Sequence, residues 1–153
     1  MLESSEPFFG YANGASHSTQ NLYSTTWAIF APSGELVVFQ GICIDHSTNN
    51  ITEYNALIEL LSDAISLGIR WIIIRLDSQH VLLQLTNVYT IQNPTIYRMF
   101  LRVHLLEIHF GYIQYQHISR NFNTLTNSLA NYVLNKHLWH MWKVNFQFPS
   151  TVE

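Results

Sequence analysis

The sequence predicts an α/β fold: a five-stranded mixed sheet with three antiparallel strands at its N-terminal end, flanked by helices. Three β-rich segments come first and are joined by short turns, which favours an antiparallel meander. Two later strands are separated by segments with helical periodicity, which favours crossover connections. The 153 residues can bury one sizeable core and show no internal repeat or linker.

The five strands are predicted from β-branched and aromatic runs that end at turn residues. The polar stretch 16–24 is expected to turn the chain after the first strand, and Pro32-Ser33-Gly34 after the second. The fourth is an apolar run with one Arg, typical of a strand covered on both faces and paired in parallel. The predicted strands are residues 8–12, 25–31, 36–44, 71–76 and 112–118.

The helices are predicted from apolar residues that recur every three or four positions. The first helix is expected to stop at Gly68. A short helix follows Asp77 and Ser78, which stand where an N-cap belongs, and a longer one runs from Pro94 to about residue 110. The residues expected to face inward are Ala56, Leu57, Leu60, Leu61, Ala64 and Leu67, then Val81, Leu82 and Leu85, then Ile96, Met99, Phe100, Val103, Leu106 and Phe110.

One domain is expected over residues 8–137, closing with a helix over 124–137, between a polar tail at 1–7 and an aromatic tail at 138–153. The acidic, polar start does not resemble a secretory signal, and no apolar stretch reaches the roughly 20 residues that a membrane span needs. Cys43 is the only cysteine, and its strand context predicts a buried thiol. These features favour an intracellular protein, cytoplasmic or nuclear, with no membrane partner.

Charged residues are scarce in this chain. They make up 11% of it, the net charge is −3, and the seven Lys and Arg residues form no basic run. Proteins that grip nucleic acid mainly through its phosphates usually carry a basic stripe. Any binding of nucleic acid is therefore expected to be weak and to depend on individually placed hydrogen bonds.

Four short motifs are candidates for a catalytic site. The first and the last carry Asn at positions where a metal-dependent nuclease needs Asp, while Glu53 and Asp77 keep their carboxylates. The motifs are Asn13-Gly14-Ala15-Ser16, Thr48-Asn49-Asn50-Ile51-Thr52-Glu53, Asp77-Ser78-Gln79 and Asn127-Ser128-Leu129-Ala130.

In this order and at this spacing, the motifs resemble the ribonuclease H family, most closely the shorter type of archaeal-like enzymes and plant retroelement polyproteins. The resemblance covers about residues 8–137. Segment 49–58 is similar to the helix-opening segment of that family, and 68–79 to its central strand and following turn. Segment 89–97 is similar to the stretch before its next long helix, and 117–131 to its final strand, loop and helix.

The resemblance implies a ligand set and an activity. In the family, an Asp-Glu-Asp-Asp set holds two Mg²⁺ ions, or Mn²⁺, and the enzyme cuts the RNA strand of an RNA–DNA hybrid. The four ligand positions fall on Asn13, Glu53, Asp77 and Asn127, so only Glu53 and Asp77 remain as anionic metal ligands.

The resemblance also implies substrate contacts. Family positions that touch the hybrid in its minor groove, where RNA displays its 2′-hydroxyls, fall on Asn49, Asn50 and Gln79. The glycine-rich loop that follows the first Asp of the family is replaced here by His17-Ser18-Thr19-Gln20-Asn21. Its loss favours natural divergence of a retroelement domain over deliberate replacement of Asp by Asn.

The two Asn replacements predict impaired or absent catalysis, as in a pseudoenzyme. Two Mg²⁺ ions roughly 3.5–4 Å apart act on the attacking and the leaving oxygen, and such a pair needs anionic oxygen ligands. Two amides in place of two carboxylates halve the negative charge that the protein supplies. The bridging position, which the resemblance places at Asn13, suffers most, because an amide has only one oxygen.

Simpler roles stay open for the same residues. Asp77 can be a helix N-cap, Glu53 a first-turn residue that favours the helix dipole, and Asn13 a turn residue before Gly14. His117, at the end of a predicted strand, is either a candidate proton shuttle or an ordinary surface histidine.

Two rival functions also stay open. One is a working hybrid ribonuclease in which Asp45, expected in a loop, or His117 substitutes for a lost ligand. The other is a protein-interaction domain on the same fold. The candidate partners are thus RNA–DNA hybrid or duplex RNA, bound weakly, and a second copy of the chain or a neighbouring segment of a polyprotein.

Overall fold

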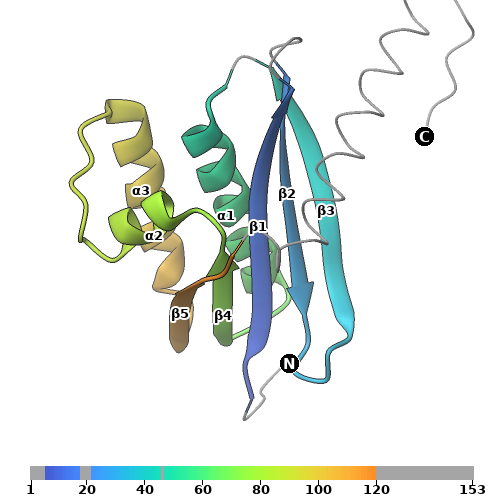
Figure 1. The fold of residues 1–153 in the computed structure, drawn as a ribbon. Coiled ribbons are helices and arrows are strands. Elements are labelled where there is room, and N and C mark those ends of the chain that lie inside the picture. Colours follow the sequence, from blue (N-terminus) through green and yellow to red (C-terminus); the bar gives the residue numbers. More distant parts are fainter. Residues whose placement is uncertain (1–5, 18–21, 46, 120–153) are drawn as a thin grey trace, which may run out of the picture.

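The fold is given by a computed structural model that describes residues 6–17, 22–45 and 47–119 (Figure 1). The helix predicted over 124–137 and the aromatic tail lie outside the described residues. In chain order the elements are β1 (Phe8–His17), β2 (Leu22–Phe30), β3 (Leu36–Asp45), α1 (Asn49–Ser66), β4 (Trp71–Leu76), α2 (Gln79–Leu85), α3 (Pro94–Glu107) and β5 (Tyr112–His117).

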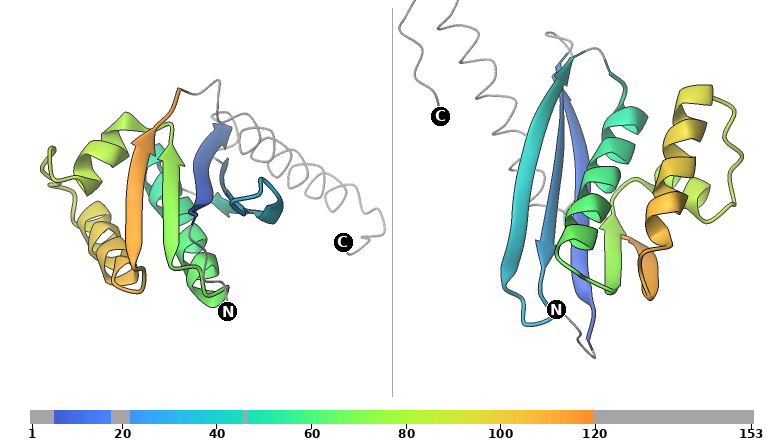
Figure 2. Two further views of the ribbon diagram at one scale, coloured as in Figure 1. Left: turned by 90° about the horizontal axis from the view of Figure 1, so that it is seen from below. Right: turned by 180° about the vertical axis from the view of Figure 1, so that it is seen from behind.

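The described strands form one mixed sheet in the order β3-β2-β1-β4-β5. β2 is antiparallel to β1 and to β3, whereas β4 is parallel to both β1 and β5. α1 lies against one face of this sheet, and α3 lies beside α1 on the same side (Figure 2). The predicted α/β fold, with five strands and an antiparallel N-terminal meander, is confirmed.

Local sequence sets both ends of α1. Thr48 caps its start by accepting a hydrogen bond on its side-chain oxygen. Gly68 ends it in the left-handed region, with φ of +77°, and the Ile69 amide donates back to the Ala64 carbonyl at 3.0 Å. Leu67, predicted to face inward, is instead 36% exposed because it is the C-cap residue.

The core lies between α1 and the sheet. Leu57, Leu60 and Leu61 of α1 are fully buried against strand residues such as Ile72. Gly10 of β1 allows this close packing, because a Cβ atom at that position would lie 2.9 Å from the Leu60 side chain. Burial of these side chains stabilises the fold by roughly 1.5–3 kcal/mol each.

β1 and β2 extend further into polar sequence than predicted. β1 continues to His17 and β2 begins at Leu22, so the prediction of a turn over 16–24 is wrong for most of that stretch. Hydroxyl side chains in β2 find partners inside the protein, as when the Thr25 hydroxyl donates to the Thr52 carbonyl of α1. These bonds allow polar residues to be buried in a strand.

Four further details differ from the expectations. Asp45 lies at the end of β3, paired with Leu22, and not in a loop, while Cys43 is only half-buried. α3 ends at Glu107, before residue 110, although Phe110 is still buried. β4 alternates between buried and half-buried side chains and is not covered equally on both faces, because α1 packs on one face.

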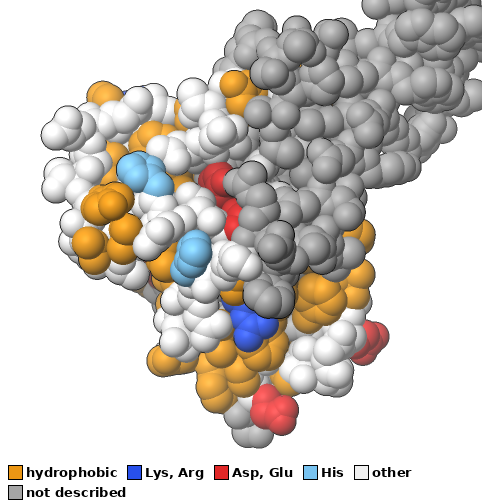
Figure 3. Space-filling view, in the orientation of Figure 1, with side chains coloured by type: hydrophobic (Ala, Val, Ile, Leu, Met, Phe, Trp, Pro, Cys, Tyr) orange, Lys and Arg blue, Asp and Glu red, His pale blue; other side chains and the backbone are white. Residues whose placement is uncertain are grey.

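The surface in view carries few charged side chains. Apolar and uncharged polar groups make up most of the described surface visible in Figure 3, as expected for a chain with 11% charged residues. Among the described residues, no helix is both long enough and apolar enough to cross a membrane.

A partly buried hydrogen bond joins β5 to α3. The Tyr115 hydroxyl donates to Glu107, which also accepts from or pairs with His104 at 2.7 Å. Burial, reinforced by the nearby Glu107 carboxylate, raises the pKa of Tyr115 well above its ordinary value of 10.0. The folded state therefore holds the phenol proton at pH values where the unfolded chain loses it.

This shift predicts a loss of stability in alkali. The contribution of Tyr115 is fully present below pH 10 and falls above it, by up to about 1.4 kcal/mol per pH unit. Urea denaturation between pH 8 and pH 11 measures the slope. The Tyr115→Phe variant is expected to show a shallower alkaline slope than the wild type, whereas Tyr112→Phe, at an exposed position, leaves it unchanged. Equal slopes for both variants would contradict the assignment.

Candidate active site

Two of the predicted site residues meet at the edge of the sheet where β4 ends and its parallel pairing with β1 stops. Ala12 of β1 pairs in parallel with Leu76 of β4. Asn13 is the next residue in β1, and Asp77 comes directly after β4. The two side chains therefore stand at the same edge of the sheet, on adjacent parallel strands. Ligands of open α/β sheets bind outside this edge.

Glu53 is brought to the same edge by a close approach of α1 to β1. Gly14 follows Asn13, and a Cβ atom at Gly14 would lie 2.4 Å from the Thr52 hydroxyl oxygen and 3.4 Å from the Glu53 amide nitrogen. Only glycine leaves room for this contact. The backbone of α1 at Thr52 is also held by the Thr25 hydroxyl of β2.

The three polar groups are removed from solvent to different degrees. Asn13 is 2% exposed and Glu53 is 9% exposed, while Asp77 is half-buried as a residue but has both carboxylate oxygens buried. The Thr26 hydroxyl donates to the Asn13 carbonyl at 3.4 Å across the β1–β2 ladder. Burial of an amide costs much less free energy than burial of a charge.

The simpler roles considered for these residues are wrong. Asn13 lies within the β1–β2 ladder opposite Thr26, and not in a turn. Ser78, and not Asp77, caps α2, because its hydroxyl accepts from the Val81 amide at 3.2 Å. The first turn of α1 contains no acidic residue, so Glu53 lies beyond the reach of the helix dipole.

The predicted substrate-contacting residues lie at the starts of two helices. Asn49 and Asn50 open α1, and Gln79 opens α2. Asn49 and Gln79 are exposed, and Asn50 is half-buried. Both helix starts lie at the sheet edge that carries Asp77. The side-chain amides of Asn49, Asn50 and Gln79 are therefore near a ligand placed at that edge.

His117 reaches the same edge from β5. It pairs with Leu76, the residue before Asp77, and its side chain is exposed. Its position therefore fits the proton-shuttle hypothesis as well as an ordinary surface role. Asn127 and residues 18–21 lie outside the described residues, and so does the side chain of Asp45.

A buried network, which the sequence analysis missed, positions α2 and with it Gln79. The Tyr54 hydroxyl of α1 donates to Gln84 Oε1 at 2.8 Å, and Gln84 Nε2 lies 3.1 Å from His80 Nε2. Burial raises the pKa of Tyr54, so its phenol stays a neutral donor. A polar Gln84 between the inward-facing Val81 and Leu85 was the available signal in the sequence.

Among the described residues, the donors at this edge supply less negative charge than a pair of Mg²⁺ ions carries. Glu53 and Asp77 supply two negative charges and Asn13 supplies an amide, against the four positive charges of two ions. The described part of the chain contains no group of three or more His, Cys, Asp or Glu residues that could hold a metal.

The comparisons with known proteins place this chain in a family. A family model described as reverse transcriptase-like matches residues 12–133, and the chain belongs to that family. It is 33% identical to ribonuclease HI of Halobacterium salinarum over 124 residues, which are 81% of this chain and 62% of that protein. It is 32% identical over 88 residues to a bifunctional protein of Mycobacterium tuberculosis, of which this match covers 24%. The chain thus spans less than two thirds of these relatives.

Solved structures show the same architecture. Ribonuclease H1 of Halobacterium salinarum superposes with a TM-score of 0.80 at 32% identity, covering 85% of this chain and 98% of that one. LC11-RNase H1, solved in complex with an RNA/DNA hybrid, gives 0.79 at 23% identity, covering 86% and 99%, and shows the fold alone. The domain is therefore ribonuclease H-like, as the motifs indicated.

A Gly14→Ala substitution tests the contact between β1 and α1. The added methyl group meets Thr52 at 2.4 Å and must displace the start of α1, which we expect to cost about 1–3 kcal/mol of unfolding free energy. Chemical denaturation measures this loss. Thr52→Ala in the same chain should restore part of it. Unchanged stability in Gly14→Ala would show that α1 is not held this closely.

A second substitution tests the network behind α2. Tyr54→Phe leaves the buried Gln84 oxygen without its donor and is expected to cost about 1–3 kcal/mol. Tyr97→Phe, at a residue that is 47% exposed, is the matched control and should be neutral. Adding Gln84→Met to Tyr54→Phe should recover stability. Equal stability of the two Phe variants would contradict a buried, satisfied network.

Proposed function

We propose that this domain binds RNA–DNA hybrid, or duplex RNA, weakly, and that it hydrolyses the hybrid slowly or not at all. The observation that carries this proposal is the amide of Asn13, 2% exposed, beside the end of β4, where the carboxylates of Glu53 and Asp77 also lie. The site thus combines the scaffold of a nuclease with too little negative charge for its metal ions.

Three features support nucleic acid as the ligand. The chain belongs to the reverse transcriptase-like family, and its relatives include a ribonuclease HI. LC11-RNase H1, which shares the fold, was solved with an RNA/DNA hybrid. Asn49, Asn50 and Gln79 border the site with amide groups that can both donate and accept hydrogen bonds, as reading a 2′-hydroxyl requires.

Electrostatics supports the loss of catalysis. Two Mg²⁺ ions supply transition-state stabilisation worth several kcal/mol, but only while anionic ligands hold both ions in place. Here the amide at residue 13 brings a partial charge and one oxygen, and Asn127 repeats the change in the sequence. The retained Glu53 and Asp77 are the residues that would contact an ion.

The sparse charge of the chain supports weak binding. With a net charge of −3 and few cations, the phosphate-driven part of the affinity is small. We propose a retroelement polyprotein as the origin of the domain, in keeping with its family. A homo-oligomer or a polyprotein neighbour remains a candidate partner.

Restoring the carboxylates tests the proposal directly. A labelled RNA–DNA hybrid is incubated with the wild type and with Asn13→Asp/Asn127→Asp, first in Mg²⁺ and then in Mn²⁺. The double variant is expected to cut at least roughly a hundredfold faster than the wild type, because several kcal/mol of transition-state stabilisation return.

The control for this test is Asn87→Asp/Asn93→Asp, which adds the same charge at two exposed positions and should not cut. Wild-type turnover equal to that of the restored variant would overturn the proposed impairment. It would favour the rival enzyme with substitute ligands such as His117. Absence of hybrid binding in every variant at low salt would instead overturn the nucleic-acid function and favour a protein-interaction domain.

A further inference from the structure

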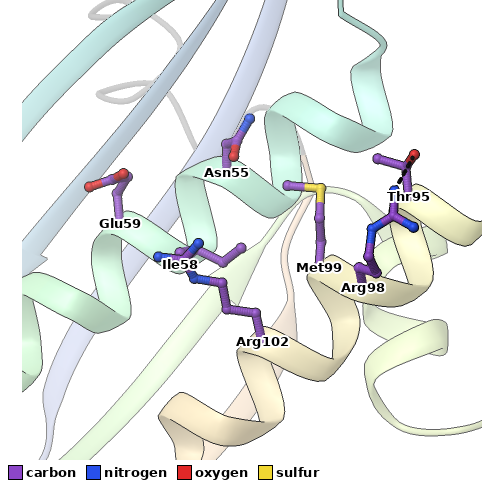
Figure 4. A pocket seen from close by; sticks show the side chains of 7 residues that line it. All are labelled: Asn55, Ile58, Glu59, Thr95, Arg98, Met99 and Arg102. Carbon is purple, nitrogen blue, oxygen red and sulfur yellow. Dashed lines mark hydrogen bonds between the residues drawn. The ribbon is translucent and has the colours of Figure 1, made fainter.

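A second polar site lies between α1 and α3, away from the strand ends. We call it the α1–α3 groove and define it by Asn55 and Glu59 of α1 and by Thr95, Arg98, Met99 and Arg102 of α3 (Figure 4). Its cavity volume is about 230 Å³. Asn55 and Glu53 are two residues apart, so they point to different sides of α1.

The groove holds half of the arginines in the described part of the chain. These are Arg70, Arg75, Arg98 and Arg102. Arg75 is engaged elsewhere, since it donates to the Tyr11 hydroxyl at 2.6 Å and lies over the Phe9 ring at 4.5 Å. In a chain with so few cations, two arginines on one groove are a marked concentration of positive charge.

Neither groove arginine forms an ion pair with a described carboxylate. Within the described residues, the single ion pair joins His104 and Glu107, so Glu59 lines the groove without closing on either guanidinium within 4.0 Å. Arg98 makes only a long hydrogen bond to the Thr95 hydroxyl at 3.4 Å. The two guanidinium groups therefore keep free donors, and both side chains are exposed.

These donors suit a phosphate. Guanidinium groups bind phosphate oxygens through two parallel hydrogen bonds, and side chains four residues apart on a helix lie about 5–6 Å from each other at their Cβ atoms. Figure 4 shows Arg98 and Arg102 rising from successive turns of α3, with Asn55 across the groove on α1. The Thr95 hydroxyl lies beside Arg98 at one end of the groove, and the Asn55 amide adds an uncharged donor on α1 (Figure 4). Glu59 lowers the net charge to +1, which limits the strength of the contact.

We propose that the α1–α3 groove binds a backbone phosphate of the nucleic acid whose scissile region lies at the strand ends. This inference rests on the proposed function. The groove and Glu53 lie on different sides of a helix about 10–12 Å across, a span that roughly three to four nucleotides of a strand can cover. The contact carries no base information and positions the strand.

The salt dependence of hybrid binding tests the groove. Each lost phosphate contact makes the plot of log association constant against log salt concentration less steep, by about 0.9 in slope. Arg98→Gln and Arg102→Gln are each compared with Arg70→Gln, which makes the same charge change at an exposed position outside the groove. Between 50 and 200 mM salt, wild-type affinity should fall about threefold more than that of either groove variant, while Arg70→Gln behaves as the wild type.

A gain of affinity provides the complementary test, because a misfolded variant cannot produce it. Glu59→Gln removes the anion from the groove and should tighten hybrid binding about threefold at 100 mM salt, whereas Glu35→Gln, exposed in the β2–β3 turn, should have a smaller effect. Inorganic phosphate serves as a second probe. Competition with the hybrid at millimolar phosphate, lost in Arg98→Gln, would support the groove contact. Phosphate binding at Arg98 that leaves hybrid affinity unchanged would identify a site for free phosphate alone and overturn the contact.

The outcomes separate this inference from the proposed function. Hybrid binding with equal slopes in the Arg98, Arg102 and Arg70 variants would overturn the groove contact and leave the proposed function intact. No hybrid binding by the wild type at 50 mM salt would overturn both.

Discussion

The close approach of β1 to α1 is the constraint on which the site depends. At Gly14 there is no room for a side chain, because the Thr52 hydroxyl occupies the space that a Cβ atom would need. This contact fixes Glu53 near the end of β4, and the parallel pairing of Ala12 with Leu76 fixes Asn13 and Asp77 there. The close approach of two backbones and the pairing of two strands thus bring the candidate site residues together.

The chemistry of residue 13 then decides what the assembled site can do. A buried carboxylate needs a cation or several donors to offset its lost hydration, whereas a buried amide does not. With Asn13 almost wholly buried, the scaffold can remain stable without a metal ion, and the same change removes the anion that a bridging ligand must supply. The proposed function, hybrid recognition with little hydrolysis, follows from an amide at this position.

Much of the fold could be predicted from the sequence, because its signals are local. Apolar periodicity marks α1, Gly68 marks its end, and Pro94 marks the start of α3. The polar halves of β1 and β2 could not be predicted, since Thr25 is buried only because its hydroxyl reaches Thr52 across the core. The candidate ligands came from the resemblance to the ribonuclease H family, while the Gly14 contact is a tertiary feature that neither the motifs nor their spacing reveal.

A Mg²⁺ titration of the wild-type protein, followed by NMR at Glu53 and Asp77, tests the central electrostatic claim most directly. We expect gradual, unsaturated changes up to roughly 10 mM Mg²⁺, and saturation at lower concentration once Asn13→Asp restores the bridging carboxylate, because Mg²⁺ selects hard anionic oxygen ligands. Saturable binding of two ions by the wild-type chain below millimolar concentration would contradict it.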